Sequence, residues 1–297
     1  MRVAHFSDLH LLDLHAVSPL DFASSKVLVG SVNVLLNRAR KHRLDCFEAL
    51  VDDLNAQRYD HVVCTGDLVN LGLPAEYELA ARLVSQIRLG PAGVTLVPGN
   101  HDYYTRAAIT ARRFERAFAP FLRGDAGGAV RYPFLRLRGA VAIIGLCSAY
   151  ASPLGFADGL LGPRQIAAAE ALLTQPDVRE RFRLVLVHHP PVVHHGLFVR
   201  HLRDRGALLR MLARAGAELV VHGHDHRAER AETPGRDGPI PIIGVASGSY
   251  ADERPDRAAQ YHVYHIERGR PARITRRVWD RNTSKFKDIE WQVSTGT

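Results

Sequence analysis

Short apolar runs alternate along this chain with longer stretches in which apolar residues recur every three or four positions. The runs are typical of buried strands, and the longer stretches are typical of helices with one buried face. Strands are predicted at residues 3–6, 61–65, 94–97, 182–187 and 218–221. Helices are predicted at residues 45–57, 76–89, 105–118, 162–173 and 202–215.

Additional strands are predicted outside this alternation. Arg138-Gly139 signals a hairpin between strands at residues 130–137 and 140–146. After residue 226 there are only strand-like stretches, at residues 240–245, 261–266 and 274–279. Strands alternating with helices, together with hairpins, indicate an α/β layered sandwich with mixed sheets.

The chain has no internal repeat or low-complexity linker, so we expect one domain over residues 1–297. We also expect a C-terminal strand and tail extension from about residue 240. An insert at about residues 13–43 carries apolar residues at helix-like intervals and then a basic run: Arg38, Arg40, Lys41, His42 and Arg43. Two interpretations of residues 26–43 stay open. The segment is either a lid over the site with a solvated basic end, or a peripheral contact with an anionic membrane surface.

Polar clusters follow five of the predicted strands: Asp8 with His10, Asp67, Asn100 with His101, His188 with His189, and His224 with His226. Because open α/β sheets bind ligands at the carboxyl ends of their strands, we expect these side chains to gather at one edge. Carboxylates and imidazoles without thiolates suit Mn, Fe or Zn. The set is too large for one tetrahedral ion and fits two ions that share a bridging carboxylate. Two ions about 3.5–4 Å apart can clamp a phosphate and activate water.

Charge and composition narrow the class of partner. The net charge of +8 fits an anionic substrate, whereas the scattered arginines and the absence of a basic-aromatic track do not signal nucleic acid. The three cysteines lie far apart, which indicates a reducing compartment without disulfides. The N-terminus enters a strand at once, and no apolar run reaches the roughly 18 residues of a membrane span. We therefore expect a cytoplasmic protein, either free or peripheral at the inner membrane face.

The order of these motifs resembles the signature of the calcineurin-like metallophosphoesterase superfamily. The matching residues are Asp8-Leu9-His10, Gly66-Asp67, Gly99-Asn100-His101-Asp102, His188 and Gly223-His224-Asp225-His226. The resemblance implies a four-layer α/β/β/α sandwich and two metal ions. It implies a first ion held by Asp8, His10, Asp67 and His226. It implies a second ion held by Asp67, Asn100, His188 and His224, with Asp67 as the bridge.

The resemblance also implies roles for the neighbouring residues. His101 would not be a ligand but would lie near the leaving-group oxygen as general acid or charge stabiliser, held by Asp102. His188 is preferred to His189 as the ligand because it directly follows the strand. Three other histidines are candidates for contact with substrate: His189, His194 and His195. His222 lies outside the signature and is expected behind the site or in the core.

The motifs most resemble those of the bacterial class III cyclic-nucleotide phosphodiesterase branch, so we expect hydrolysis of small phosphodiesters such as cyclic nucleotides. The lid interpretation admits an alternative, a pyrophosphohydrolase of the UDP-diacylglucosamine type or another lipid-linked phosphoesterase. Usual members of that group carry Arg where His101 stands. A phosphomonoesterase is a further alternative. A non-catalytic scaffold is disfavoured because such chains usually lose ligands.

Overall fold

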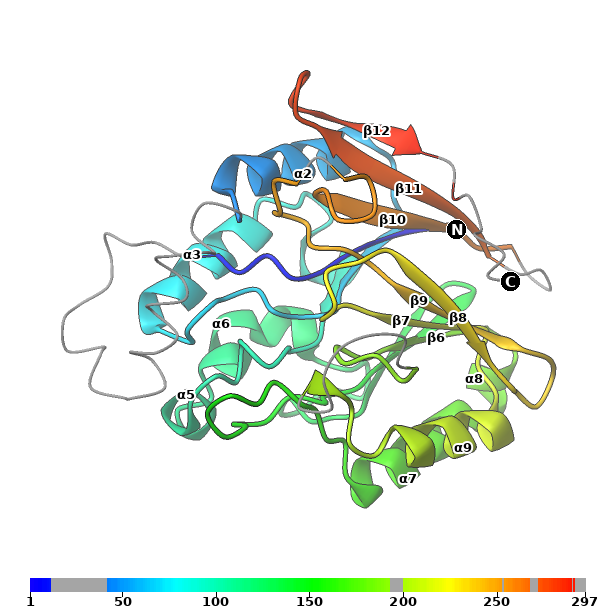
Figure 1. Cartoon of the computed structure of the whole chain (residues 1–297). Coiled ribbons are helices and arrows are strands. Elements are labelled where there is room, and N and C mark those ends of the chain that lie inside the picture. The colour runs from blue at the N-terminus through cyan, green and yellow to red at the C-terminus, as the bar shows by residue number, and fades with distance from the viewer. Residues whose placement is uncertain (12–41, 193–199, 253, 268–271, 290, 292–297) are drawn as a thin grey trace.

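The structure is a computed structural model of the chain, and it describes residues 1–11, 42–192, 200–252, 254–267, 272–289 and 291 (Figure 1). Its strands form two six-stranded sheets. The first sheet has the spatial order β12 (Lys285–Ile289), β11 (Arg273–Asp280), β10 (Gln260–His265), β1 (Arg2–Phe6), β2 (His61–Cys64) and β3 (Val94–Leu96). The second has the order β4 (Phe134–Arg138), β5 (Val141–Gly145), β6 (Phe182–Leu186), β7 (Leu219–His222), β9 (Ile240–Gly244) and β8 (Glu229–Thr233).

Both sheets are mixed, as predicted. Strands β1, β2 and β3 are parallel, and so are β5, β6, β7 and β9. The remaining pairs are antiparallel. The segment from residue 240 onward supplies strands to both sheets, because β9 extends the second sheet and β10 pairs with β1 of the first. This arrangement supports the single domain that we propose.

The helices cover the outer faces of the two sheets (Figure 1). The helices on the side of the first sheet contact its strands or pack against a helix that does: α2 (Leu44–Ala56), α3 (Pro74–Val84), α4 (Gly90–Gly93), α5 (Arg106–Thr110) and α6 (Arg113–Leu122). Those of the second sheet are α7 (Pro163–Leu173), α8 (Pro176–Arg179) and α9 (Arg205–Ala215). Successive strand residues face opposite sides. Val62 and Cys64 pack with the helices, and Val63 packs with the other sheet.

Three apolar cores result, one between the sheets and one beneath each helical layer. The predicted four-layer α/β/β/α sandwich is thus confirmed.

Some predicted elements differ from the structure. The helix predicted at residues 105–118 is wrong as a single unit, because Arg112 has a left-handed backbone with φ of 48° and separates α5 from α6. The helix predicted at residues 76–89 ends at Val84, after which two tight turns bring Ile87 into the core. Strand β4 begins only at Phe134. Strands β8 and β12 were not predicted, since these sheet-edge strands alternate charged residues with few apolar ones.

Most of the insert at residues 13–43 lies outside the described residues. Its two interpretations, as a lid and as a membrane contact, therefore concern residues outside the described part of the chain. Its last two residues are described. The Arg43 guanidinium pairs with Asp45 and lies 5.8 Å from the ring of Trp279. Among the helices within the described ranges, none is long and apolar enough to cross a membrane.

Candidate metal centre

Loops at the carboxyl ends of β1, β2, β3, β6 and β7 meet at one edge, where backbone hydrogen bonds join them. The Asp8 N–H donates to the Gly66 carbonyl at 2.9 Å, and the Gly223 N–H donates to the His188 carbonyl at 3.2 Å. The Gly248 N–H donates to the Ser7 carbonyl at 2.8 Å. The polar clusters that the sequence placed after separate strands are therefore brought together.

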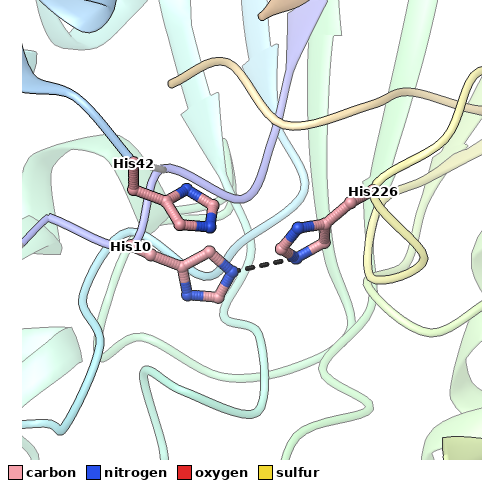
Figure 2. Close-up of side chains that lie close together, drawn as sticks. All are labelled: His10, His42 and His226. Atoms are coloured by element: carbon pink, nitrogen blue, oxygen red, sulfur yellow. Dashed lines mark hydrogen bonds between the residues drawn. The ribbon is translucent and has the colours of Figure 1, made fainter. Parts of the chain in front are cut away.

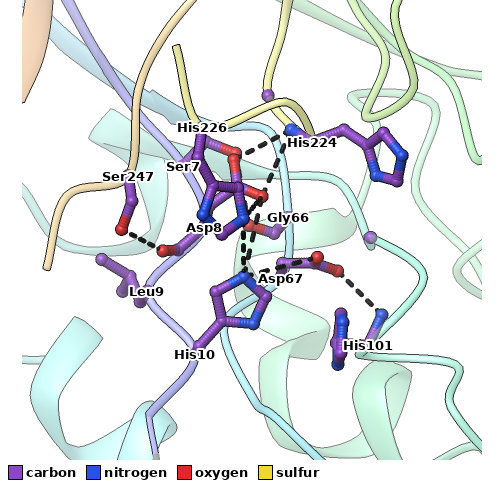
Figure 3. A network of polar contacts seen from close by, with 12 residues as sticks. Ser7, Asp8, Leu9, His10, Gly66, Asp67, His101, His224, His226 and Ser247 are labelled. Carbon is purple, nitrogen blue, oxygen red and sulfur yellow. Dashed lines mark hydrogen bonds and ion pairs between the residues drawn. The ribbon is translucent and has the colours of Figure 1, made fainter. Parts of the chain in front are cut away.

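One group of side chains surrounds a common point: Asp8, His10, Asp67 and His226. His10 Nε2 lies 3.0 Å from His226 Nε2 (Figure 2). His226 Nε2 lies 3.4 Å from Asp8 Oδ1, and His10 Nε2 lies 3.8 Å from Asp67 Oδ2 (Figure 3). Ligand atoms about 2.1 Å from a metal lie about 3.0–3.4 Å apart at octahedral or tetrahedral angles. These four side chains have close to that spacing.

A second group lies beside the first: Asp67, Asn100, His188 and His224. His188 Nε2 lies 3.1 Å from Asn100 Oδ1 and 3.2 Å from His224 Nδ1. His224 Nδ1 lies 3.0 Å from Asn100 Oδ1. Asp67 Oδ2 is 3.4 Å from His188 Nε2, and the same oxygen faces His10 of the first group. Asp67 thus has the position of a bridging carboxylate.

The electrostatics of both groups fit a cation. The carboxylates of Asp8 and Asp67 are buried. Burial alone would raise the pKa of Asp67, but His188 and His101 outweigh it and hold that pKa below its usual range. Burial, reinforced by His189 and His188, lowers the pKa of His224, so His224 is neutral and offers a lone pair. Buried carboxylates together with imidazoles are donors that Mn, Fe and Zn accept, so the residues fit two such ions.

Backbone conformation marks the same residues. Seven non-glycine residues of the described chain have positive φ, and five belong to these two groups: Asp8, His10, Asp67, His224 and His226. Their φ values lie between 47° and 73°. A non-glycine residue in this region costs on the order of 1–3 kcal/mol and persists where surrounding structure enforces it, commonly at functional sites. The strain is therefore a second, independent indication of a site.

The motif glycines permit the close packing of the loops. A Cβ on Gly99 would lie 2.2 Å from Asp67 Oδ1 and 2.7 Å from His188 Cε1. A Cβ on Gly223 would lie 2.3 Å from Asp8 Oδ2. Any other residue at these two positions would displace a carboxylate of the site.

Asp102 does not have the role expected from the sequence. Both of its oxygens accept backbone N–H groups, at 2.8–3.1 Å, from Asp67, Leu68, Val69 and Gly99. Burial and the Asp67 carboxylate raise the pKa of Asp102, and the N–H donors oppose that rise. Asp102 therefore joins the loop after β2 to the loop after β3. The group that holds His101 is the Asn70 carbonyl instead, which lies 2.5 Å from His101 Nδ1.

The His101 ring lies at the edge of the first group. It stacks on Tyr104 with a centroid distance of 5.4 Å and meets the His10 ring edge-on at 4.7 Å. Because a carbonyl only accepts, the contact with Asn70 requires a proton on Nδ1. Nε2 is then the nitrogen of His101 with which it can act on a substrate.

The other predicted histidines have different surroundings. His189 is fully buried, with Nδ1 2.8 Å from Ser148 Oγ and Nε2 3.2 Å from the Ala157 carbonyl. Its ring packs against those of His188 and His224, with centroid distances of 4.9 and 4.5 Å, so His189 lies behind these two side chains. His222 is buried with Nδ1 3.0 Å from the Gly223 carbonyl, as expected for a residue behind the site. His194 and His195 lie outside the described residues.

Sequence reasoning missed His42, which it assigned to a solvated basic run. The structure places the His42 ring 4.7 Å from the His10 ring and 5.5 Å from the His226 ring (Figure 2). An isolated backbone bridge to Tyr250 holds it there, and no local sequence pattern could reveal that long-range pairing.

Comparisons with known proteins agree with this geometry. A family model described as calcineurin-like phosphoesterase matches residues 1–228. The glycerophosphodiester phosphodiesterase GpdQ of Enterobacter lignolyticus is 29% identical over 194 residues, which is 65% of this chain and 58% of that protein. A dimetal phosphatase from Danio rerio shares the fold with a TM-score of 0.57 at 15% identity, covering 98% of this chain and 99% of that one.

A second solved structure gives the same result for the fold. The purple acid phosphatase PPD1 from yellow lupin (Lupinus luteus) seeds has a TM-score of 0.63 at 12% identity, covering 97% of this chain and 52% of that one. At such identities the two structures show likeness of fold alone. The family model, however, spans most of the chain and both groups of side chains, and the chain therefore belongs to the calcineurin-like phosphoesterase family.

Proposed function

We propose that this chain is a two-metal phosphodiesterase that acts on small diesters, such as cyclic nucleotides or glycerophosphodiesters. The observation that carries the proposal is the position of Asp67 Oδ2, which lies 3.8 Å from His10 Nε2 and 3.4 Å from His188 Nε2. One oxygen between two donor sets is the arrangement that a bridged pair of ions requires. Similarity to a glycerophosphodiester phosphodiesterase supports a diester as substrate.

The proposed ligands are divided between the two ions as the family resemblance implies. The first ion would be held by Asp8, His10, Asp67 and His226. The second would be held by Asp67, Asn100, His188 and His224. Bound there, such ions polarise phosphoryl oxygens and lower the pKa of water. The identity of the metals, Mn, Fe or Zn, is left to experiment.

The chain's own contribution to bond cleavage is assigned to His101. Its Nδ1–H donates to the Asn70 carbonyl, which holds the ring and stabilises a positive charge on it. In its imidazolium form Nε2–H can donate a proton to the departing alkoxide. His101 is close to both donor sets, because its backbone N–H donates to Asp67 Oδ1 at 2.8 Å. Asp102 acts on the reaction only through the two loops that it joins.

The alternatives retain different support. A lipid-linked pyrophosphohydrolase would rely on residues 26–43, of which only His42 and Arg43 are described, and would place a histidine where its usual members carry Arg. A non-catalytic scaffold is disfavoured by the full donor set. A phosphoester substrate and a cytoplasmic location, either free or peripheral at the inner membrane face, remain parts of the proposal.

The test is hydrolysis of bis-p-nitrophenyl phosphate and p-nitrophenyl phosphate by metal-stripped protein resupplied with Mn²⁺. The proposal predicts preference for the diester and loss of turnover in Asp67→Ala. Preference for the monoester would instead establish a phosphatase. Absence of turnover with Mn²⁺, Fe²⁺ and Zn²⁺ would favour the scaffold.

A further inference from the structure

His42 lies against the first group of side chains, although it belongs to no motif of the family signature. Its ring meets the rings of His10 and His226 edge-on, at 67° and 89° (Figure 2). One nitrogen from each of these three histidines lies within 4.8 Å of the other two. The proposed ligand set of the first ion contains two imidazoles, those of His10 and His226, and the chain brings a third beside them.

Contacts with a distant segment hold His42 in place. His42 pairs with Tyr250 in an antiparallel bridge, and the Arg43 N–H donates to the Ser249 carbonyl at 2.9 Å. The Tyr250 ring lies 5.2 Å from the His42 ring. The position of His42 is thus fixed by backbone and ring contacts on one side of the imidazole.

Two serine hydroxyls determine which nitrogen of His42 carries its proton. Ser249 Oγ donates to the Leu9 carbonyl at 2.6 Å, and Ser247 Oγ donates to the Asp8 carbonyl at 2.6 Å. Each hydroxyl has one proton, so both oxygens can only accept from His42 Nδ1, which lies 2.9 Å and 3.4 Å away. Nδ1 therefore carries a proton, and in the neutral imidazole the lone pair is on Nε2.

We propose that His42 Nε2 is a further ligand of the metal ion that His10 and His226 hold, an inference that rests on the metal centre of the proposed function. A nitrogen without a proton cannot donate to a phosphate oxygen, but it can bind a cation. A ring oriented by a hydrogen bond from its other nitrogen is the usual arrangement of metal-ligating histidines. A third imidazole would also favour Zn, Fe or Mn over Mg at this position.

The test measures metal binding directly, with Co²⁺ as the probe. Metal-stripped wild type and His42→Ala are titrated by calorimetry and by visible absorption. We expect the variant to bind the first ion about 100-fold more weakly, with Co²⁺ bands at longer wavelength because a water oxygen replaces a nitrogen ligand. The control is His265→Ala, since His265 lies in β10 and contacts Thr275 and Arg273 instead of the site.

Ser249→Ala provides a second variant that leaves the imidazole in place. It removes the nearer of the two acceptors of the His42 Nδ1–H and should weaken binding of the first ion about 10-fold, with a smaller spectral shift. If His42→Ala fails to fold, as judged by circular dichroism of the metal-free protein, Ser249→Ala carries the test through the same spectrum.

Other outcomes separate this inference from the proposed function. Two ions bound by His42→Ala with wild-type affinity and spectrum would overturn the role of His42 and leave the metal centre standing. A higher KM for the diester with an unchanged Co²⁺ spectrum would make His42 a substrate contact, which also overturns the inference. Failure of the wild type to bind two ions would refute the metal centre itself.

Discussion

Replacing Asp102 with asparagine tests whether its carboxylate joins the ligand-bearing loops. Asp102 Oδ2 accepts the N–H groups of Asp67 and Gly99 at 2.8 and 2.9 Å, and Oδ1 accepts those of Leu68 and Val69 at 3.0 and 3.1 Å. An amide has one acceptor oxygen in place of two. Whichever way the side chain turns, two buried N–H groups face an NH₂ group that cannot accept them.

The magnitude follows from those two donors. A buried donor left without a partner costs about 1–3 kcal/mol, so Asp102→Asn should lower the free energy of unfolding by about 2–6 kcal/mol. Both orientations of the amide disturb the loop that carries Asp67. The variant should therefore also bind metal more weakly, although Asp102 is not a proposed ligand.

The assay is urea denaturation of the metal-free protein, followed by Mn²⁺ titration. Asp288→Asn is the matched control, because Asp288 is largely exposed and pairs with Arg277 on the surface at 2.7 Å. Exposed ion pairs contribute about 0–1 kcal/mol, so this control should differ little from wild type. If Asp102→Asn unfolds within about 0.5 kcal/mol of wild type and retains its Mn²⁺ affinity, the reasoning is refuted.

Three further predictions follow from the site. Gly99→Ala should push the Asp67 carboxylate aside and weaken Mn²⁺ binding by about 10–100-fold, measured by calorimetry. Gly206→Ala in α9 should not, because an added Cβ there would meet only the Arg210 side chain, at 3.4 Å. Replacing His101 with asparagine should slow hydrolysis of alkyl diesters by about 10²–10⁴-fold and of p-nitrophenyl diesters less, since p-nitrophenolate leaves without protonation; equal losses in kcat would count against the acid role. Burial lowers the pKa of His188, but the Asp67 carboxylate outweighs it and raises that pKa to about 9 in the metal-free protein. Because the cation must displace this proton, Mn²⁺ affinity should rise about tenfold per pH unit up to that pKa, with proton release detected by calorimetry in two buffers; pH-independent affinity between pH 6 and 8 would contradict it.

Local pattern sufficed to predict the layered fold and the gathering of the polar clusters, whereas the proposed ligand set came from the family resemblance. Apolar strands with period two define which faces are buried, as Val62 and Val63 show by packing into different cores. Parallel strands share an edge, so polar residues after each strand must meet there. Glycines beside those residues, such as Gly99, mark where the loops approach one another.

The sequence did not suffice where a residue depends on a partner far along the chain. His42 resembled part of a solvated basic run, and only its pairing with residues 249–250 turns it toward the site. The same holds for Asp102. Its carboxylate accepts backbone N–H groups, and no sequence pattern indicates which backbone groups a carboxylate will accept. The break at Arg112 rests on a left-handed backbone that arginine rarely adopts, so propensity alone predicted a continuous helix.

The central claim, that Asp67 joins two metal ions in one centre, is tested most directly by counting bound ions. Metal-stripped wild type and Asp67→Ala are dialysed against Mn²⁺, and the protein and metal contents are then measured. The account predicts two ions per chain for the wild type and at most one for the variant, with both proteins folded by circular dichroism. Equal stoichiometry in the two proteins, whether one ion or two, would contradict it.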